Sequence, residues 1–224
     1  MFTVTRWCAW SGLGFIPRRL TNSKSKIMTS QKDLKKFRSN LRTWYKRASK
    51  DEIKQGLVWY KDAMDFAKQL STDYGVRGEV AAGVISALSP NNRWERNKFD
   101  AVQVLMAVRD DVPMDDVKVC TYNANKAKAF AIAKGDRKIL KSSPKTYAFA
   151  RNVGENDSNF VTIDKWHLRA CQTSSKKSRT CRESVTPKQY RIIQEETVKV
   201  AKEMGVKAYQ FQAIIWVTIR NQWI

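Results

Sequence analysis

Apolar residues recur at three- and four-residue steps along most of the chain from residue 32 onward, and this spacing limits the possible folds more than any other feature. In residues 52–72 the steps fall on Ile53, Leu57, Tyr60, Met64, Ala67 and Leu70. Such spacing gathers apolar side chains on one face of an α-helix. Only nine Gly and five Pro occur in 224 residues, and no segment alternates strictly between apolar and polar residues. The sequence therefore predicts an all-α fold, in one domain that spans residues 29–224.

The remaining helices are predicted from similar patterns. Segment 79–89, EVAAGVISALS, is apolar on nearly every side and indicates a buried central helix that ends before Pro90. Asn123 is the expected N-cap of a helix that Gly135 closes. Further helices are expected at 94–109, 145–153 and 164–172, then from Pro187 to Met204, and finally around 211–218. A basic, serine-rich loop is expected at 173–184.

Residues 1–28 differ in composition from the rest of the chain. They contain five Lys and Arg and several Ser and Thr but no acidic residue. This composition is typical of a mitochondrial or plastid transit peptide, and it is equally compatible with an over-extended start in which Met28 is the true first residue. The first alternative implies an organelle. The second leaves the location open and includes the host-cell cytoplasm for a viral or bacterial protein.

The charge of the chain indicates a polyanionic partner. Lys and Arg number 42 and Asp and Glu 21, so the formal net charge is +21. Nucleic acid is the commonest partner of such a chain, anionic membrane is the competitor, and solubility alone is the alternative without a partner. No run of eighteen apolar residues occurs, so no membrane span is expected. DNA is therefore the predicted partner, and no obligate protein partner is evident.

Cysteine and histidine are too few and too scattered for a predicted metal site. The cysteines stand at 8, 120, 171 and 181, without a C-x-x-C pair, and His167 is the single histidine. A zinc site or an iron–sulphur cluster therefore has little support, and no cofactor is expected. Cys171 and Cys181 are near enough in sequence to pair across the serine-rich loop, but reduced thiols are the expectation.

One lysine and one aspartate stand at two predicted helix starts. Lys145 opens the helix at 145–153. Asp164 follows the apolar run Val161-Thr162-Ile163 and opens the next helix. A carboxylate near a positive helix end is expected to stay ionised. Taken singly, Asp164 reads as an ordinary N-cap and Lys145 as a solvated or phosphate-binding lysine. Their spacing and surroundings suggest a joint role.

Residues 79–171 resemble the helix-hairpin-helix superfamily of base-excision DNA glycosylases. VISALSPNN is similar to the buried helix that ends in a DNA-wedging polar residue, and YNANKAKAFAIAKGD to the helix whose Asn/Lys-Ala start precedes the hairpin. ILKSSPKTYAFARNV is similar to the hairpin and its second helix, which carries a lysine in the family. FVTIDKWHLRAC resembles the segment that carries the essential aspartate. The chain departs from the family in its turn, Leu140–Pro144, which has no glycine, and in its histidine, which follows the aspartate by three residues rather than two.

The resemblance implies roles for particular residues. Asp164 would stabilise positive charge that develops at the sugar C1′ atom, and Lys145 would attack C1′ as an amine. Either Asn91 or Asn92 would fill the gap left by an extruded nucleotide, unless both only end the helix. DNA contacts are further expected from residues of the turn and of the second helix start, namely Lys141, Ser142, Ser143, Lys165, Trp166, His167 and Arg169. His167 is more simply interpreted as a structural hydrogen-bonding group. Trp166, and Trp94 on an earlier helix, could stack on a base but are more simply interpreted as core residues. Trp216 and Arg220 are weaker candidates for the same cleft.

Three functions are compatible with these features. The first is a DNA N-glycosylase that flips a base and acts at its N-glycosidic bond. The second is a transferase on the same scaffold that hypermodifies thymine, as in phages. The third is a DNA-binding module without catalysis, which the missing hairpin glycines favour.

Overall fold

The computed structural model describes residues 30–136, 138–175 and 181–223, and within these ranges all regular structure is helical. The all-α prediction is therefore confirmed. The predictions for residues 1–28 fall outside the described residues, as does the middle of the serine-rich loop. None of the described helices is long and apolar enough to cross a membrane. The described cysteines, Cys120, Cys171 and Cys181, are free thiols.

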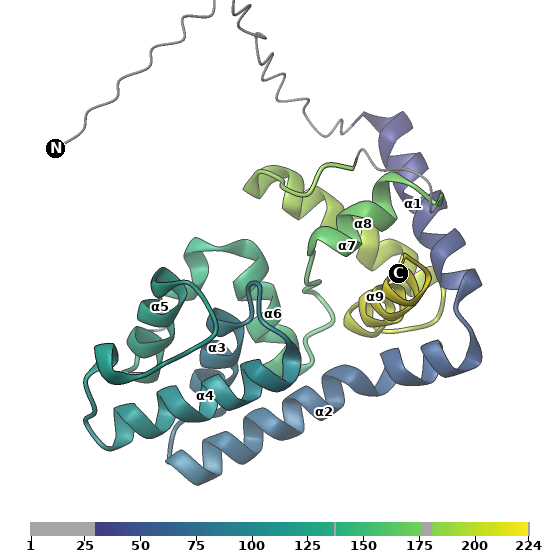
Figure 1. The fold of residues 1–224 in the computed structure, drawn as a ribbon. Helices are drawn as coiled ribbons and strands as arrows, with labels where there is room; N and C mark the ends of the chain where they lie inside the picture. Colours follow the sequence, from purple (N-terminus) through teal and green to yellow (C-terminus); the bar gives the residue numbers. More distant parts are fainter. Residues whose placement is uncertain (1–29, 137, 176–180, 224) are drawn as a thin grey trace, which may run out of the picture.

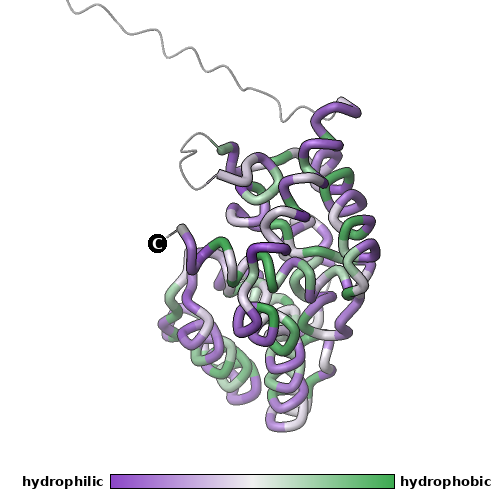
Figure 2. Tube along the Cα trace, turned by 90° about the vertical axis from the view of Figure 1, so that its right-hand side faces the viewer, coloured by the Kyte–Doolittle hydropathy of each residue, from purple (hydrophilic) through white to green (hydrophobic). Residues whose placement is uncertain are grey.

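The helices from α2 to α8 begin and end close to the predicted positions, α1 had no predicted bounds, and α9 is longer than expected at both ends. In chain order they are α1 (Gln31–Arg47), α2 (Lys50–Tyr74), α3 (Gly78–Leu88), α4 (Trp94–Arg109), α5 (Asn123–Ala133), α6 (Pro144–Glu155), α7 (Lys165–Gln172), α8 (Pro187–Glu203) and α9 (Ala208–Trp223). Short 3₁₀ turns, η1 (Met114–Asp116) and η2 (Lys138–Ser142), precede α5 and α6. Hydrophobic and hydrophilic segments alternate along the helices, as amphipathic packing requires (Figure 2).

Side-chain caps define several of these starts. Ser30, Ser49 and Thr186 each form a capping box with the residue three positions later, which fixes the first turns of α1, α2 and α8. The prediction for α5 is wrong by one residue. Tyr122 is the N-cap and makes no side-chain cap bond, so Asn123 is the first helical residue instead of the cap.

The helices form two groups, each around its own hydrophobic cluster (Figure 1). In the first group, α3 lies among α2, α4, α5 and α6, and its residues from Val80 to Leu88 are all buried. In the second, α1, α7 and α8 surround α9. The helices α2 and α9 join the groups because they contact each other more extensively than any other pair. Gly56 permits this contact, since a Cβ atom there would lie 2.5 Å from the Ile214 Cα atom.

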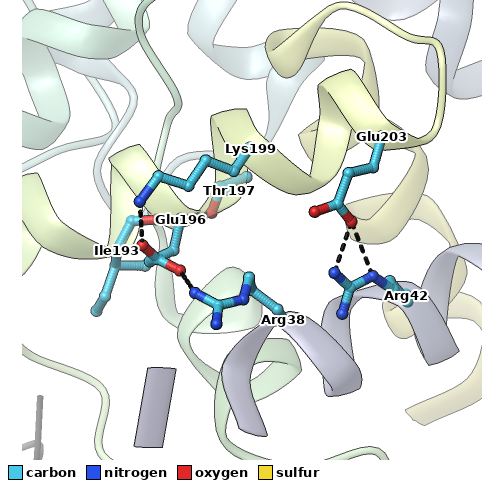
Figure 3. Close-up of polar contacts among 7 residues, drawn as sticks. All are labelled: Arg38, Arg42, Ile193, Glu196, Thr197, Lys199 and Glu203. Carbon is cyan, nitrogen blue, oxygen red and sulfur yellow. Dashed lines mark hydrogen bonds and ion pairs between the residues drawn. The ribbon is translucent and has the colours of Figure 1, made fainter. Parts of the chain in front are cut away.

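Ion pairs fasten α1 to α8 on the outside of the second group (Figure 3). Glu196 is buried and pairs with Arg38 on α1 and with Lys199 on its own helix, the latter at 2.7 Å. These cations hold the pKa of Glu196 below its usual value, although burial opposes them. One turn further along α1, two nitrogens of the Arg42 guanidinium, Nε and Nη2, donate to the Glu203 carboxylate.

Candidate active site

Asp164 is the N-cap of α7 and lies where the two helix groups meet. Its Oδ1 atom accepts a hydrogen bond from the His167 backbone N–H at 2.8 Å, and its carbonyl accepts the N–H of Leu168 at 2.9 Å. The plain reading of this residue as a helix cap is thus correct. Whether it does more depends on its surroundings.

Lys145 stands in the first turn of α6, directly after Pro144. The N-cap residue Ser143 makes no side-chain cap bond, so this helix start is left open. Lys145 is partly exposed, and its positive charge lowers the pKa of the Asp164 carboxyl. The fold therefore brings the two predicted residues, which are on helices of different groups, within electrostatic reach of each other.

The carboxyl of Asp164 resists ionisation more than we expected. Loss of solvent raises its pKa, and this effect outweighs the His167 N–H and the Lys145 charge, which both lower it. The helix end and the lysine therefore do not bring the pKa of this carboxyl to or below its ordinary value, because loss of solvent between the helix groups is the larger effect. Raised carboxyl pKa values are frequent where a protein uses a carboxyl group for chemistry.

An extended segment, residues 160–163, leads into Asp164, and in an all-α protein it has no neighbouring strand to satisfy its backbone. Side chains of α8 supply the missing hydrogen bonds. The Tyr190 hydroxyl donates to the carbonyl of Val161 at 2.7 Å and accepts from the N–H of Ile163 at 3.1 Å. The Gln194 amide oxygen accepts from the N–H of Val161 at 3.2 Å. The segment is thereby paired much as a strand would be.

The other side of this segment is held by a buried polar chain. The Asn152 amide on α6 donates to the carbonyls of Asp157 and Phe160 at 3.0 and 2.9 Å and accepts from the Thr162 hydroxyl at 3.0 Å. The Tyr60 hydroxyl on α2 lies 3.0 Å from Thr162 Oγ1 and 2.9 Å from the Gln212 amide oxygen on α9. Burial, and next the nearby charge of Asp164, raise the pKa of Tyr60 beyond any physiological range, so this hydroxyl stays protonated.

Partly exposed aromatic rings gather beside this site. Trp59 on α2 contacts Trp94, Trp216 and Phe149 with ring centroids 5.1, 5.9 and 6.0 Å apart. The Arg220 guanidinium lies 4.4 Å from the centroid of Trp216. Trp59 also contacts Tyr60, whose hydroxyl lies 3.0 Å from Thr162 Oγ1, and Phe149 stands one helical turn after Lys145 on α6. We refer to Trp59, Trp94 and Trp216 as the tryptophan cluster. The predicted residues Trp94 and Trp216 are among its members, and the predicted Arg220 contacts it through Trp216.

His167 is buried and structural. The Thr197 hydroxyl donates to the carbonyl of Ile193 at 2.8 Å, so it accepts from His167 Nε2–H at 2.9 Å (Figure 3 shows the threonine). The other ring nitrogen, Nδ1, is buried without a hydrogen-bond partner. Burial lowers the pKa of His167 to about 4, so the ring is neutral at physiological pH. Its side chain is 1% exposed, which removes it from the predicted DNA contacts and is the reason that prediction is wrong.

The other predicted residues of α7 form a small outer cluster. Trp166 is partly exposed and packs against the second hydrophobic cluster. The cations of Lys165 and Arg169 lie 5.5 and 4.9 Å from its ring. Arg169 also pairs with Glu183 across the serine-rich loop. Trp166 therefore belongs to a different surface from the tryptophan cluster.

The two asparagines after α3 have different environments. Asn92 donates to the Leu88 carbonyl at 3.3 Å and to the buried carboxylate of Asp100 at 2.9 Å. Its amide N–H groups are therefore used within the turn, and a DNA contact by this residue stays a prediction. Asn91 is exposed, has a positive φ of 59° and donates to the Tyr122 hydroxyl at 3.0 Å. Tyr122, a large aromatic residue that is 65% exposed, was not predicted.

The turn before α6 stands where the DNA glycosylases of the resemblance have a glycine-containing hairpin turn. It is the 3₁₀ turn η2, in which Lys141 is exposed. The Ser142 hydroxyl donates to the Ile139 carbonyl at 2.7 Å, and Ser143 accepts from the Thr146 hydroxyl at 3.0 Å. The hydroxyl hydrogen of Ser142 is thus used within the turn, which leaves Lys141 and the first N–H groups of α6 as the stronger candidates for an anion contact.

Sequence reasoning missed the polar residues that hold the site in place, above all Asn152, Tyr190 and Gln212. Each is an isolated polar residue within an apolar helical pattern, and no motif distinguishes such a residue from a solvent-exposed one. The polar interruption of a core-facing helical stripe is the signal that was available. Among the described residues no group of three His, Cys, Asp or Glu is arranged to hold a metal ion.

The fold and site define an all-α protein in which a lysine and an aspartate approach each other from two helix starts. The chain belongs to DUF7178, a family of unknown function, which it matches over residues 23–223. Neither the curated proteins nor the solved structures include a significant match to it.

Proposed function

We propose that this protein is a DNA-binding enzyme of the DNA glycosylase type, which extrudes a base and acts at the bond between C1′ and the base nitrogen. The observation that carries the proposal is the approach of Lys145 to Asp164 at two helix starts, where the lysine charge lowers the pKa of a carboxyl that burial raises. A strongly basic chain, with a formal net charge of +21, supports a polyanionic substrate.

The chemistry assigns different tasks to the two residues. As the base leaves, positive charge develops on the sugar, and the ionised Asp164 carboxylate stabilises it from within a poorly solvated site. The Lys145 side chain attacks C1′ as the neutral amine, after it has lost a proton. The new C–N bond forms as the bond to the base breaks, the electron pair leaves with the base, and the base takes up a proton. If water attacks in its place, Lys145 serves to bind the DNA backbone.

The tryptophan cluster supports binding of an extruded base. Its rings are partly exposed, Trp59 contacts Phe149, which stands one helical turn after Lys145, and Arg220 adds positive charge over Trp216. Stacking on an aromatic ring contributes roughly 1–3 kcal/mol per base. Asn91, exposed on the turn after α3, is the residue that would occupy the gap in the duplex.

Product analysis distinguishes this function from its two rivals. Duplexes that carry uracil, 5-hydroxymethyluracil, thymine glycol, 8-oxoguanine or 3-methyladenine are incubated with the protein and analysed by mass spectrometry. A free base supports the proposal, a modified nucleoside supports a base-modifying transferase, and unchanged DNA that is nevertheless bound supports a binding module. Asp164→Asn is the matched control and should release at least about 10²-fold less base.

Borohydride trapping separates the two forms of the mechanism. If the Lys145 amine attacks C1′, borohydride reduces the resulting imine and leaves a covalent protein–DNA adduct. The parent chain should then give an adduct and Lys145→Gln none. Base release without any adduct from the parent chain would assign the attack to water.

A further inference from the structure

The segment that carries Asp164 has an unusual environment. Residues 160–163 are extended, and their backbone groups are hydrogen-bonded to side chains from helices on both sides: Asn152 on α6, and Tyr190 and Gln194 on α8. Buried backbone groups need partners, but contacts to water or to a neighbouring backbone would satisfy that need as well. Side-chain partners additionally fix the segment relative to two particular helices.

The Tyr190 hydroxyl makes the most specific of these contacts. It bridges the carbonyl of Val161 and the N–H of Ile163, the residues on either side of Thr162. Ile163 directly precedes Asp164. Its ring belongs to the second hydrophobic cluster, so the hydroxyl has little freedom to move. A displacement of Tyr190 would therefore displace the start of α7.

Asn152 holds the same segment from the other helix group. It lies on α6, two turns after Lys145, and is fully buried. Its amide contacts the carbonyl of Phe160 and the hydroxyl of Thr162, so the helix that carries Lys145 is tied directly to the segment that carries Asp164. Thr162 continues this connection to Tyr60, which lies near Gln212.

We infer that Tyr190 and Asn152 are positioning residues, which set the location of the Asp164 carboxyl relative to Lys145 by holding residues 160–163 from opposite sides. The effect of these residues on catalysis rests on the proposed function. Their effect on the position of the Asp164 carboxyl does not depend on that function. The residues act through the backbone and touch no reacting atom. A displacement of a catalytic group by about 1 Å costs on the order of 10²-fold in rate.

The test is Tyr190→Phe, which removes the bridging hydroxyl and keeps the ring. Tyr209→Phe is the matched control, because Tyr209 is also a buried tyrosine, and its hydroxyl is outside the contacts to residues 160–163. The first readout is the titration of Asp164 by carboxyl ¹³C NMR. We expect its pKa to move down toward the ordinary value in Tyr190→Phe, since a loosened segment admits water, and to stay unchanged in Tyr209→Phe.

The second readout is the single-turnover rate of base release, measured together with the dissociation constant for DNA. We expect Tyr190→Phe to lose roughly tenfold to a hundredfold in rate with DNA binding unchanged within about twofold. If the parent releases no base, the proposed function fails, and the NMR titration still decides the positioning role. An Asp164 titration that is identical in the parent and in Tyr190→Phe overturns the inference.

A second variant protects this test against loss of folding. Thr162→Val removes the hydroxyl that joins Asn152 to Tyr60 and nearly preserves the volume of the side chain. It should shift the Asp164 titration in the same direction as Tyr190→Phe. A shift in the opposite direction, or none, contradicts the positioning role.

Discussion

At the scale of single residues, the notable group is a carboxyl that caps a helix and is nevertheless poorly solvated. Because burial raises the pKa of Asp164 in the folded protein above its unfolded value, the ionised form lowers stability, and the cost grows as the pH rises through the folded pKa. A group that reduces stability at physiological pH, at a site with a nearby lysine, is the pattern expected of a functional residue.

Asp164→Asn should therefore leave stability unchanged or raise it at pH 7. Asparagine caps helices about as well as aspartate, so the capping change costs at most about 1 kcal/mol, and a poorly solvated, partly buried charge is removed. Urea unfolding at several pH values measures this. The advantage of the variant should shrink as the pH falls through the folded pKa of Asp164. A variant that is clearly less stable than the parent at pH 7 would assign Asp164 to capping alone.

His167 should make the protein sensitive to mild acid. Its pKa is about 4 in the folded protein, against 6.5 for an unperturbed histidine, so protons bind preferentially to the unfolded state. The stability that depends on a neutral His167 is fully present above pH 6.5 and is lost as the pH falls toward 4. The loss amounts to about 3 kcal/mol, at 1.36 kcal/mol for each pH unit.

The comparison of the parent with His167→Gln isolates this effect, because the chain has a single histidine. Glutamine retains an amide donor for Thr197 but does not titrate. Unfolding free energies at pH 7 and pH 4.5 should differ less for the variant than for the parent. Asp164 changes the unfolding free energy with pH in the opposite direction to His167. It does so equally in the parent and the variant, so its effect cancels when the two chains are compared. Equal pH dependence of the two chains would contradict a buried neutral histidine.

At the scale of elements, the crossing of α2 and α9 holds the two helix groups together. Gly56→Ala places a Cβ atom 2.5 Å from the Ile214 Cα atom, and a backbone atom cannot move aside as a side chain does. We expect destabilisation at the upper end of the roughly 1–3 kcal/mol typical of overpacked sites. Gly78→Ala is the control, since nothing lies within 4 Å of its Cβ position. Thermal midpoints of the two variants provide the measurement, and equal midpoints would show that the helices separate without cost.

At the scale of the whole molecule, the charge predicts how the protein binds. If DNA binding neutralises six or more phosphates, affinity should fall by about 10³-fold or more between about 50 and 200 mM salt. Fluorescence anisotropy with a labelled duplex measures this dependence directly. An affinity that is independent of salt would exclude phosphate contacts as its source, and with them the DNA-binding interpretation in each of its forms.

The sequence alone determined the all-α class and the ends of several helices. Apolar residues at helical spacing, and residues such as Pro90, Gly135 and Pro187 at helix ends, act within a few positions of themselves, so α3, α4, α7 and α8 are found almost where the pattern places them. Asp164 was recognised as a helix start for the same reason. The cap of α5 was misplaced because Asn123 and Tyr122 are adjacent and the propensity of asparagine for caps is only a preference.

Only the tertiary structure decided which residues surround the site. The approach of Lys145 to Asp164 and the hydrogen bonds of Asn152 and Tyr190 to residues 160–163 depend on how consecutive helices pack against one another. The contact of Trp59 with Trp216 joins helices that are far apart in the sequence. The sign of the Asp164 pKa shift was likewise undetermined, because burial depends on how the two helix groups close around the carboxyl. Local preferences determine where a helix starts, whereas solvation and long-range contacts are properties of the packed chain.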